Sequence, residues 1–121
     1  MTLAAHIAAL GGRIGFDWYR AKTFVEHAIA FSDDALHVFA GVLLQVLAAA
    51  VLRRSLASWL PWLAVALLEL ANEAVDLWIE RWPDFAEQLG EGGKDVLLTL
   101  FLPTVLLIVA RRWPRVMTGR K

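Results

Sequence analysis

The amino-acid sequence predicts an all-α integral membrane protein, with an N-terminal interfacial amphipathic helix and three transmembrane helices. Hydrophobic residues make up 59% of the 121 residues and the mean hydropathy is +0.55, whereas soluble domains use about 45–50% apolar residues. Three stretches contain no Asp, Glu, Lys or Arg, namely residues 35–52, 55–68 and 96–110. The alternating pattern of a membrane barrel strand is absent from the sequence. Because backbone groups in lipid must be hydrogen-bonded internally, these stretches are predicted to be helices.

Composition and charge exclude several classes of protein. Twelve Lys and Arg balance twelve Asp and Glu, so the chain lacks the positive charge of a nucleic-acid-binding protein and no nucleic-acid partner is expected. The apolar content excludes an intrinsically disordered chain. The absence of cysteine from the sequence excludes disulfide bonds, thiolate metal sites and cysteine nucleophiles.

Residues 1–31 are predicted to form the interfacial segment, because charged side chains interrupt every apolar run there. Residues 18–22 place Trp and Tyr beside Arg and Lys. This pattern is typical of aromatic rings at headgroup level with cations that reach lipid phosphates. Gly11 and Gly12 are expected to divide the segment into two short helices.

Residues 32–121 are predicted to form the three-helix transmembrane domain. Ser32 is a suitable N-cap for the first span. Ser58 and Pro61 fit the opening turn of the second span. A bilayer core needs about 20 helical residues, so the second helix must continue through acidic positions toward Ile79 and carry ionisable groups into or near the membrane.

The third span is predicted around residues 96–110. The glycine-rich residues 90–93 are expected to form a loop before Lys94. Inside the span, Pro103 has no N–H to donate to the carbonyl of Thr99, which predicts a kink or an unpaired carbonyl there.

Lys and Arg close to the span ends predict the orientation of the domain. The side of the first loop and the C-terminal tail carries seven of them: Arg53, Arg54, Arg111, Arg112, Arg115, Arg120 and Lys121. The opposite side carries the other five. We therefore expect a cytoplasmic C-terminus in a bacterial-type inner membrane, with the acidic second loop facing outward.

The second span carries a carboxylate-rich face. Its polar residues are Glu69, Asn72, Glu73, Asp76 and Glu80, at offsets of 0, 3, 4, 7 and 11. At about 100° per residue they fall within an arc of about 100°, which is one face of a helix.

The first and third spans carry matching polar stripes. On the first span these are Asp33, Asp34, His37, Gly41 and Gln45, and on the third they are Asp95 and Thr99. The glycine permits close approach of two helices. All three stripes lie toward the same membrane face. Ionisable groups at membrane depth are costly and usually mark a function or a partner, and several adjacent carboxylates either share protons or hold a cation.

In size and layout the chain resembles the prokaryotic diacylglycerol kinase and undecaprenol kinase family, which has a surface helix followed by three membrane helices. The residues that carry the resemblance are Glu69, Asn72, Asp76, Lys94 and Asp95. The resemblance implies that Glu69 is the catalytic base and Asp76 a Mg²⁺ ligand. It also implies that Lys94 and Asp95 bind nucleotide, and Asp34 would match an acidic position at the start of the first span.

A second resemblance is to the VanZ-like membrane proteins. These carry an Asp-x-x-His at the start of a span, a polar helix led by Glu and a later Asp. Asp34 with His37, Glu69 and Asp95 occur here in that order. The kinase family places its site on the cytoplasmic face, whereas the distribution of Lys and Arg places this site outside, so both resemblances stay open.

The candidate site residues fall into three groups by expected role. They are Glu69 and Asp95 as catalytic groups, Asn72, Lys94 and Thr99 as substrate-binding groups, and Asp34, His37, Glu73 and Asp76 as ligands of Mg²⁺. Structural alternatives stay open, because Asp76, Glu80 and Asp95 also suit headgroup-level positions and His37 also suits helix packing. As a metal ligand, His37 would act with Asp33 or Asp34.

Three functions fit these residues. The first is metal-assisted chemistry on the phosphate headgroup of a membrane lipid. The second is a non-catalytic accessory or structural subunit, in which the carboxylate face pairs with a neighbouring chain in a homo-oligomer or a larger membrane complex. The third is handling of ions or protons by Glu69 and His37.

Overall fold

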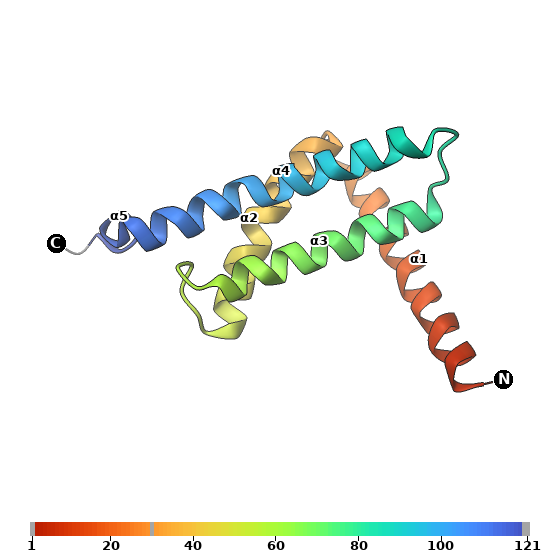
Figure 1. Ribbon diagram of the computed structural model, residues 1–121, viewed down its shortest axis with the longest axis horizontal. Coiled ribbons are helices and arrows are strands. Elements are labelled where there is room, and N and C mark those ends of the chain that lie inside the picture. Colours follow the sequence, from red (N-terminus) through yellow and green to blue (C-terminus); the bar gives the residue numbers. More distant parts are fainter. Residues whose placement is uncertain (1, 30, 120–121) are drawn as a thin grey trace.

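The computed structural model describes residues 2–29 and 31–119, in which every regular element is a helix. The helices are α1 (Leu3–Ile29), α2 (Asp33–Leu52), α3 (Trp59–Ile79), α4 (Phe85–Arg112) and the short α5 (Pro114–Thr118). Helices α2, α3 and α4 pack on one another as a bundle, while α1 contacts α3 and its N-terminal half projects away (Figure 1). The all-helical class is confirmed, and α2 and α4 are each long and apolar enough to cross a membrane.

The predicted break at Gly11 and Gly12 is wrong, because α1 runs unbroken from Leu3 to Ile29. A Cβ on Gly12 would lie 3.2 Å from the Trp78 ring, and Gly15 is the buried residue of α1. Gly12 and Gly15 therefore form a flat contact surface for α3. A helical glycine costs about 1 kcal/mol relative to alanine, a cost that this packing offsets.

The predicted loop at residues 90–93 is also wrong, because these residues lie inside α4. Asp84 caps that helix, its Oδ1 accepting hydrogen bonds from Ala86 N at 2.9 Å and Glu87 N at 3.2 Å. The chain therefore turns earlier, in residues 80–84. A Cβ on Gly92 would lie 2.8 Å from Glu73 Oε2, so this glycine lets the carboxylate approach α4.

The predicted helix starts are confirmed. Ser32 caps α2 and accepts from Ala35 N at 3.2 Å, and Ser58 caps α3 and accepts from Leu60 N at 3.2 Å. As predicted, helix α3 continues through its acidic positions to Ile79.

Helices α2 and α4 approach closely at Gly41. A Cβ there would lie 2.0 Å from the carbonyl oxygen of Thr99, the carbonyl that Pro103 leaves without its helical donor. One turn further on, the buried Gln45 Nε2 donates to the carbonyl of Pro103 at 3.0 Å. Gly41 of α2 thus faces the Thr99 carbonyl of α4, which Pro103 leaves without a helical donor.

The interior of the bundle changes character along its length. Toward the start of α2 its buried side chains are polar, ending at Thr99 and Gln45. Beyond Gln45 the buried residues are apolar: Pro61, Val65, Ala66, Leu107 and Ala110. The polar interior is therefore open to one end of the bundle and closed toward the other in the described chain.

Candidate functional site

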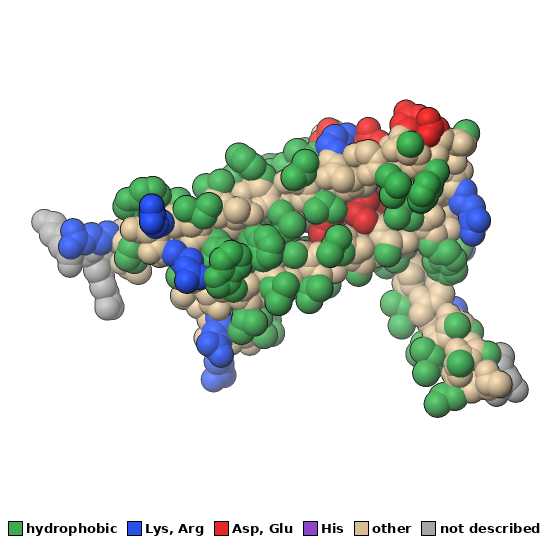
Figure 2. All heavy atoms as spheres, in the orientation of Figure 1, with side chains coloured by type: hydrophobic (Ala, Val, Ile, Leu, Met, Phe, Trp, Pro, Cys, Tyr) green, Lys and Arg blue, Asp and Glu red, His purple; other side chains and the backbone are tan. Residues whose placement is uncertain are grey.

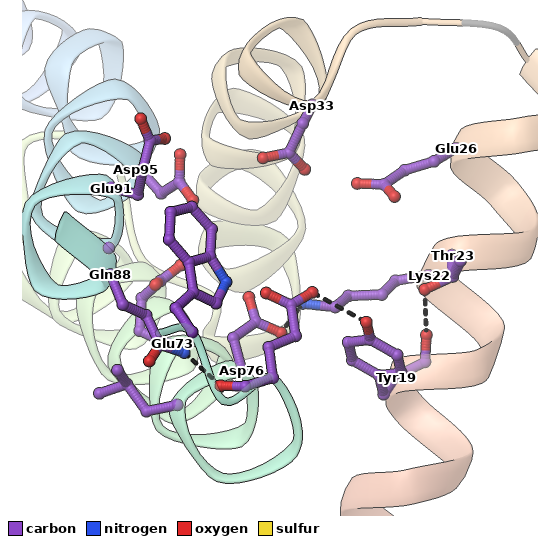
Figure 3. A pocket seen from close by; sticks show the side chains of 14 residues that line it. Tyr19, Lys22, Thr23, Glu26, Asp33, Glu73, Asp76, Gln88, Glu91 and Asp95 are labelled. Carbon is purple, nitrogen blue, oxygen red and sulfur yellow. Dashed lines mark hydrogen bonds and ion pairs between the residues drawn. The ribbon is translucent and has the colours of Figure 1, made fainter. Parts of the chain in front are cut away.

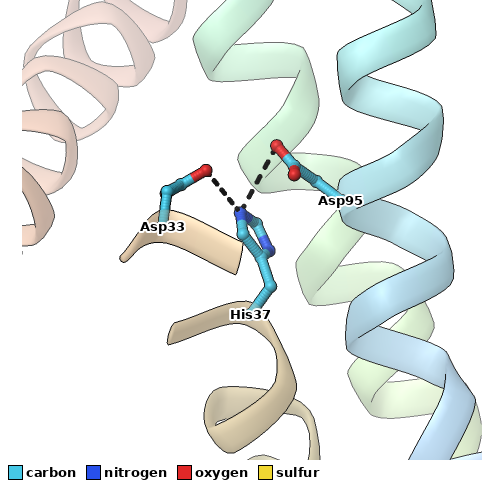
Figure 4. Close-up of side chains that lie close together, drawn as sticks. All are labelled: Asp33, His37 and Asp95. Atoms are coloured by element: carbon cyan, nitrogen blue, oxygen red, sulfur yellow. Dashed lines mark ion pairs between the residues drawn. The ribbon is translucent and has the colours of Figure 1, made fainter. Parts of the chain in front are cut away.

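His37, in the first turns of α2, lies at the centre of the polar interior. Its Nδ1 is hydrogen-bonded to Thr99 Oγ1 at 2.9 Å and lies 3.2 Å from Glu69 Oε1. Its Nε2 lies 3.5 Å from Asp95 Oδ2 and 3.6 Å from Asp33 Oδ2 (Figure 4). Both ring nitrogens therefore face oxygen atoms, which come from α2, α3 and α4.

Two groups of potential metal ligands share this imidazole. The first is His37 with Asp33 and Asp95, and the second is His37 with Glu69 and Glu73. Within each group the ligand atoms lie within 4.8 Å of one another. That spacing suits atoms that coordinate one cation.

Two buried carboxylate oxygens strengthen the case for a cation. Glu69 is 7% exposed and Asp95 is 8% exposed. Glu69 Oε1 and Asp95 Oδ1 are buried without a hydrogen-bond partner among the described residues, although Glu69 Oε1 lies beside His37. Because an unsatisfied buried oxygen is costly, these atoms fit a site that receives a positive ligand.

A cleft of about 290 Å³ opens beside these residues, between α1 and the ends of α3 and α4 (Figure 3). Seven carboxylates line it: Glu26, Asp33, Glu73, Asp76, Glu80, Glu91 and Asp95. The lining contains one basic residue, Lys22. The cleft is therefore strongly acidic and is suited to cations rather than to bare anions.

Helix α1 is attached to α3 by three polar side chains on its cleft side. Trp18 Nε1 and Lys22 Nζ each donate to Asn72 Oδ1 at 2.9 Å, and Lys22 also pairs with Asp76. Tyr19 OH donates to Glu80 Oε1 at 2.8 Å. Asn72 is thus an acceptor that holds α1 in place.

The acidic surroundings change the pKa values of two α1 side chains. The hydrogen bond to Glu80, with burial and nearby carboxylates adding to it, raises the pKa of Tyr19 to about 12. The interaction with the carboxyl group of Asp33, which faces it across the cleft (Figure 3), together with burial, raises the pKa of Glu26 to about 7. The surface helix therefore carries groups that respond to the charge of the cleft.

We expect Tyr19 to titrate near pH 12 rather than at its ordinary value of 10.0. Because the pKa is raised in the folded state, the stability from this bond is fully present below the ordinary value and is lost as the pH rises through about 12. Tyr19 is the single tyrosine of the chain, so phenolate absorbance reports it alone. In Glu80→Gln the midpoint should fall toward the ordinary value, and in Glu87→Gln it should stay; a wild-type midpoint at the ordinary value would refute the contact.

The structure brings together five of the predicted site residues. Glu69, Glu73, Asp95, Thr99 and His37 meet between the three bundle helices. Within this set Thr99 contacts the imidazole, so its position suits holding His37 in orientation.

The other four predicted residues have different partners. Asp34 pairs with Lys94 at 3.1 Å on the surface, and Lys94 also pairs with Glu91 at 2.8 Å. Asp76 and Asn72 bind α1 through Lys22. These four residues lie outside the two ligand groups.

Sequence reasoning left open, or did not assign, the site roles of several residues that the structure places here. Asp33, rather than Asp34, faces His37, and the spacing of four residues was the available signal. Lys22 and Glu26 reach the cleft from α1, for which no local pattern exists. Gln88, which donates to the carbonyl of Glu80, precedes the predicted loop, and no sequence pattern marked it.

Comparison with protein families, with curated proteins and with solved structures finds no match to this chain. The residues themselves offer a histidine beside buried carboxylates, and two of the carboxylates near it, Asp33 and Asp95, also line the acidic cleft. Such a site can bind a cation and can move a proton between carboxylates.

Proposed function

We propose that this chain is an integral membrane protein that binds a divalent cation at His37 and, through it, the phosphate headgroup of a membrane lipid. The observation that carries the proposal is the meeting of Glu69, Glu73 and Asp95 at His37, with the buried Asp95 Oδ1 lacking a hydrogen-bond partner in the described chain. In this proposal the bound cation assists a reaction at the phosphate of the lipid headgroup.

The outward surface of the bundle supports insertion in a membrane. Large apolar side chains are exposed on α2 and α4, including Phe39 at 62%, Leu97 at 73% and Phe101 at 66%. Soluble monomers rarely expose apolar patches of this extent. We propose α3 as the third span, because its acidic face points toward the site while Leu63, Leu67 and others are exposed.

We propose a bacterial-type inner membrane with a cytoplasmic C-terminus, from the distribution of Lys and Arg. Of the residues that carry this prediction, Arg120 and Lys121 lie outside the described residues. In this orientation the acidic cleft faces away from cytoplasmic ATP. Of the two resemblances, the VanZ-like one therefore fits this proposal better than the kinase-like one.

The donor set favours a divalent cation with mixed oxygen and nitrogen ligands. Carboxylates suit Mg²⁺, the cation predicted from the sequence, and an imidazole nitrogen also suits Mn²⁺ or Zn²⁺. When bound, such an ion polarises a phosphoryl oxygen and neutralises its charge. The seven carboxylates that line the cleft repel a bare phosphate, so a phosphate binds there only together with a cation.

We propose Glu69 and Asp95 as the groups that accept or donate protons. His37 lies between them, with Nδ1 toward Glu69 and Nε2 toward Asp95, so before a cation occupies the imidazole its ring is placed to pass a proton from one carboxylate to the other. Ion transport across the bundle is disfavoured, because beyond Gln45 the interior is filled by Val65 and Leu107.

The test is to measure Mn²⁺ binding to the detergent-solubilised protein by electron paramagnetic resonance. We expect binding that Glu73→Gln weakens about tenfold or more, while the matched variant Glu87→Gln, at an exposed position in the first turn of α4, leaves it unchanged. With Mn²⁺ bound, the phosphorus resonance of a short-chain phospholipid should broaden. Equal Mn²⁺ affinity in both variants would contradict the proposed cation site.

A subunit function is the second candidate, and α1 is the observation that favours it. Leu3, Ile7, Leu10 and Ile14 form one helical stripe, and all four are more than half exposed. Figure 1 shows this part of α1 projecting from the bundle. If Mn²⁺ does not bind, the stripe supports packing against a second copy or a larger membrane complex, with a non-catalytic role.

A further inference from the structure

Charges are segregated between the two ends of the bundle. Five described arginines lie at the end away from the acidic cleft: Arg53, Arg54, Arg111, Arg112 and Arg115. The sequence has no Asp or Glu in residues 35–68 or after Asp95, and no ion pair between described residues involves an arginine. Figure 2 shows Lys and Arg gathered at this end without acidic side chains.

Three of these arginines lie at the C-terminal ends of helices. Arg53 is the left-handed C-cap of α2, and Arg111 and Arg112 form the last turn of α4. Cations at helix C-termini are favoured by the helix dipole. These arginines have no acidic partner among the described residues.

An apolar groove of about 300 Å³ lies at the same end of the bundle as these arginines. It is formed by residues 55–57, Ala110 and the helix α5, and its lining includes Leu56, Pro114 and Met117. Arg54 precedes this lining in sequence and Arg115 belongs to the same short helix as Pro114. An apolar groove at the same end of the bundle as several cations suits an amphiphilic anion, because the apolar part can fill the groove and the charge can pair with the cations.

Tryptophans mark the level of this groove. The guanidinium of Arg111 lies 5.6 Å from the centre of the Trp59 ring, and Trp59 packs edge-on against Trp62. Trp113 separates α4 from α5. Tryptophan is enriched where membrane meets water, so these rings suit the level at which a lipid headgroup joins its acyl chains.

We propose that this end of the bundle binds an anionic phospholipid, with its phosphate at the arginines and the upper part of an acyl chain in the groove. Guanidinium groups bind phosphate through paired hydrogen bonds, and each basic residue near an anionic membrane surface contributes favourably. The proposal rests on the membrane insertion proposed above and is independent of the cation site. A free anion would leave the groove empty, and a nucleic acid would not fill an apolar one.

The test compares thermal unfolding of the detergent-solubilised protein with added phosphatidylglycerol, phosphatidylcholine of the same chain length, or inorganic phosphate. We expect saturable stabilisation by phosphatidylglycerol, at concentrations at least tenfold lower than for phosphatidylcholine. Each of Arg54→Gln and Arg115→Gln should weaken this binding about fivefold. The matched variant Arg81→Gln, at the other end of the bundle, should not.

Filling the groove separates a lipid site from a simple anion site. Ala57→Trp should weaken binding of phosphatidylglycerol while all five arginines remain. Equal effects of the two lipids, equal stabilisation by inorganic phosphate, or an equal loss in Arg81→Gln would each overturn the proposal. Loss of Mn²⁺ binding in Glu73→Gln, with lipid binding retained, would show that the two sites are separate.

Discussion

Gly41→Ala should lower the free energy of unfolding by about 3 kcal/mol, the upper part of the range for overpacked cores. The added Cβ would lie 2.0 Å from the Thr99 carbonyl oxygen and 2.9 Å from its carbonyl carbon. Because these atoms are backbone, no side chain can rotate away. Helices α2 and α4 must move apart, which lengthens the contact between His37 and Thr99. We therefore expect weaker Mn²⁺ binding as well as lower stability.

Gly93→Ala is the matched control for this substitution. It also places a methyl group on a helical glycine, but no atom outside its own helix lies within 4 Å of the new Cβ in the described chain. Alanine is the better helix former by about 1 kcal/mol, so this variant should be unchanged or slightly more stable. Unfolding in mixed micelles, monitored by circular dichroism, measures both variants. A Gly41→Ala protein as stable as Gly93→Ala would exclude the close approach.

The contact between Gly41 and the Thr99 carbonyl is an example of what could be predicted from the sequence. Gly41 was expected to permit close helix approach and Pro103 to free the carbonyl of Thr99, and the structure joins these two predictions at one point. Helical periodicity also predicted the shared face of Glu69 and Glu73. Local rules of this kind depend on spacing within one helix, which the sequence displays directly.

Contacts between helices were harder to predict. Asp33 and Asp34 are neighbours, so they point about 100° apart on α2, and the packing of α4 decides which one faces His37. Gly12 of α1 and Gly92 of α4 belong to glycine runs that indicated breaks by local propensity, yet Gly12 packs against Trp78 and Gly92 against Glu73 within continuous helices. Propensity is local, whereas such contacts join residues far apart in the chain.

The docking of α1 depends on a charge that the sequence could not place. Lys22 is the one basic residue in the lining of the cleft, and it binds both Asn72 and Asp76 on α3. The side chains of Lys22 and Asp76 are 20% and 18% exposed. This part-buried pair therefore connects the surface helix to the bundle and offsets the negative charge of the cleft.

Lys22→Met is expected to release α1 from α3. The substitution leaves Asp76 without its counter-charge beside Glu80 and Glu73. Removing one partner of a fully buried pair costs about 3–5 kcal/mol. The partial exposure of this pair lowers the expected cost to about 2 kcal/mol, which is a factor of about 30 in the population of docked α1. Spin labels on cysteines at Ala21 and Glu87 should report a narrow distance distribution in the wild type and a broad one in Lys22→Met.

Two further variants separate loss of the ion pair from loss of a side chain. In Arg20→Met, which removes a cation that lies 5.5 Å over the Phe16 ring of its own helix, the distance distribution should stay narrow. In the double variant Lys22→Met with Asp76→Leu, docking should largely recover, because replacing both charges with apolar groups removes the uncompensated carboxylate. If Lys22→Met alone keeps the narrow distribution, the contacts of Trp18 and Tyr19 hold α1 without the ion pair. The lysine would then serve mainly to balance the charge of the cleft.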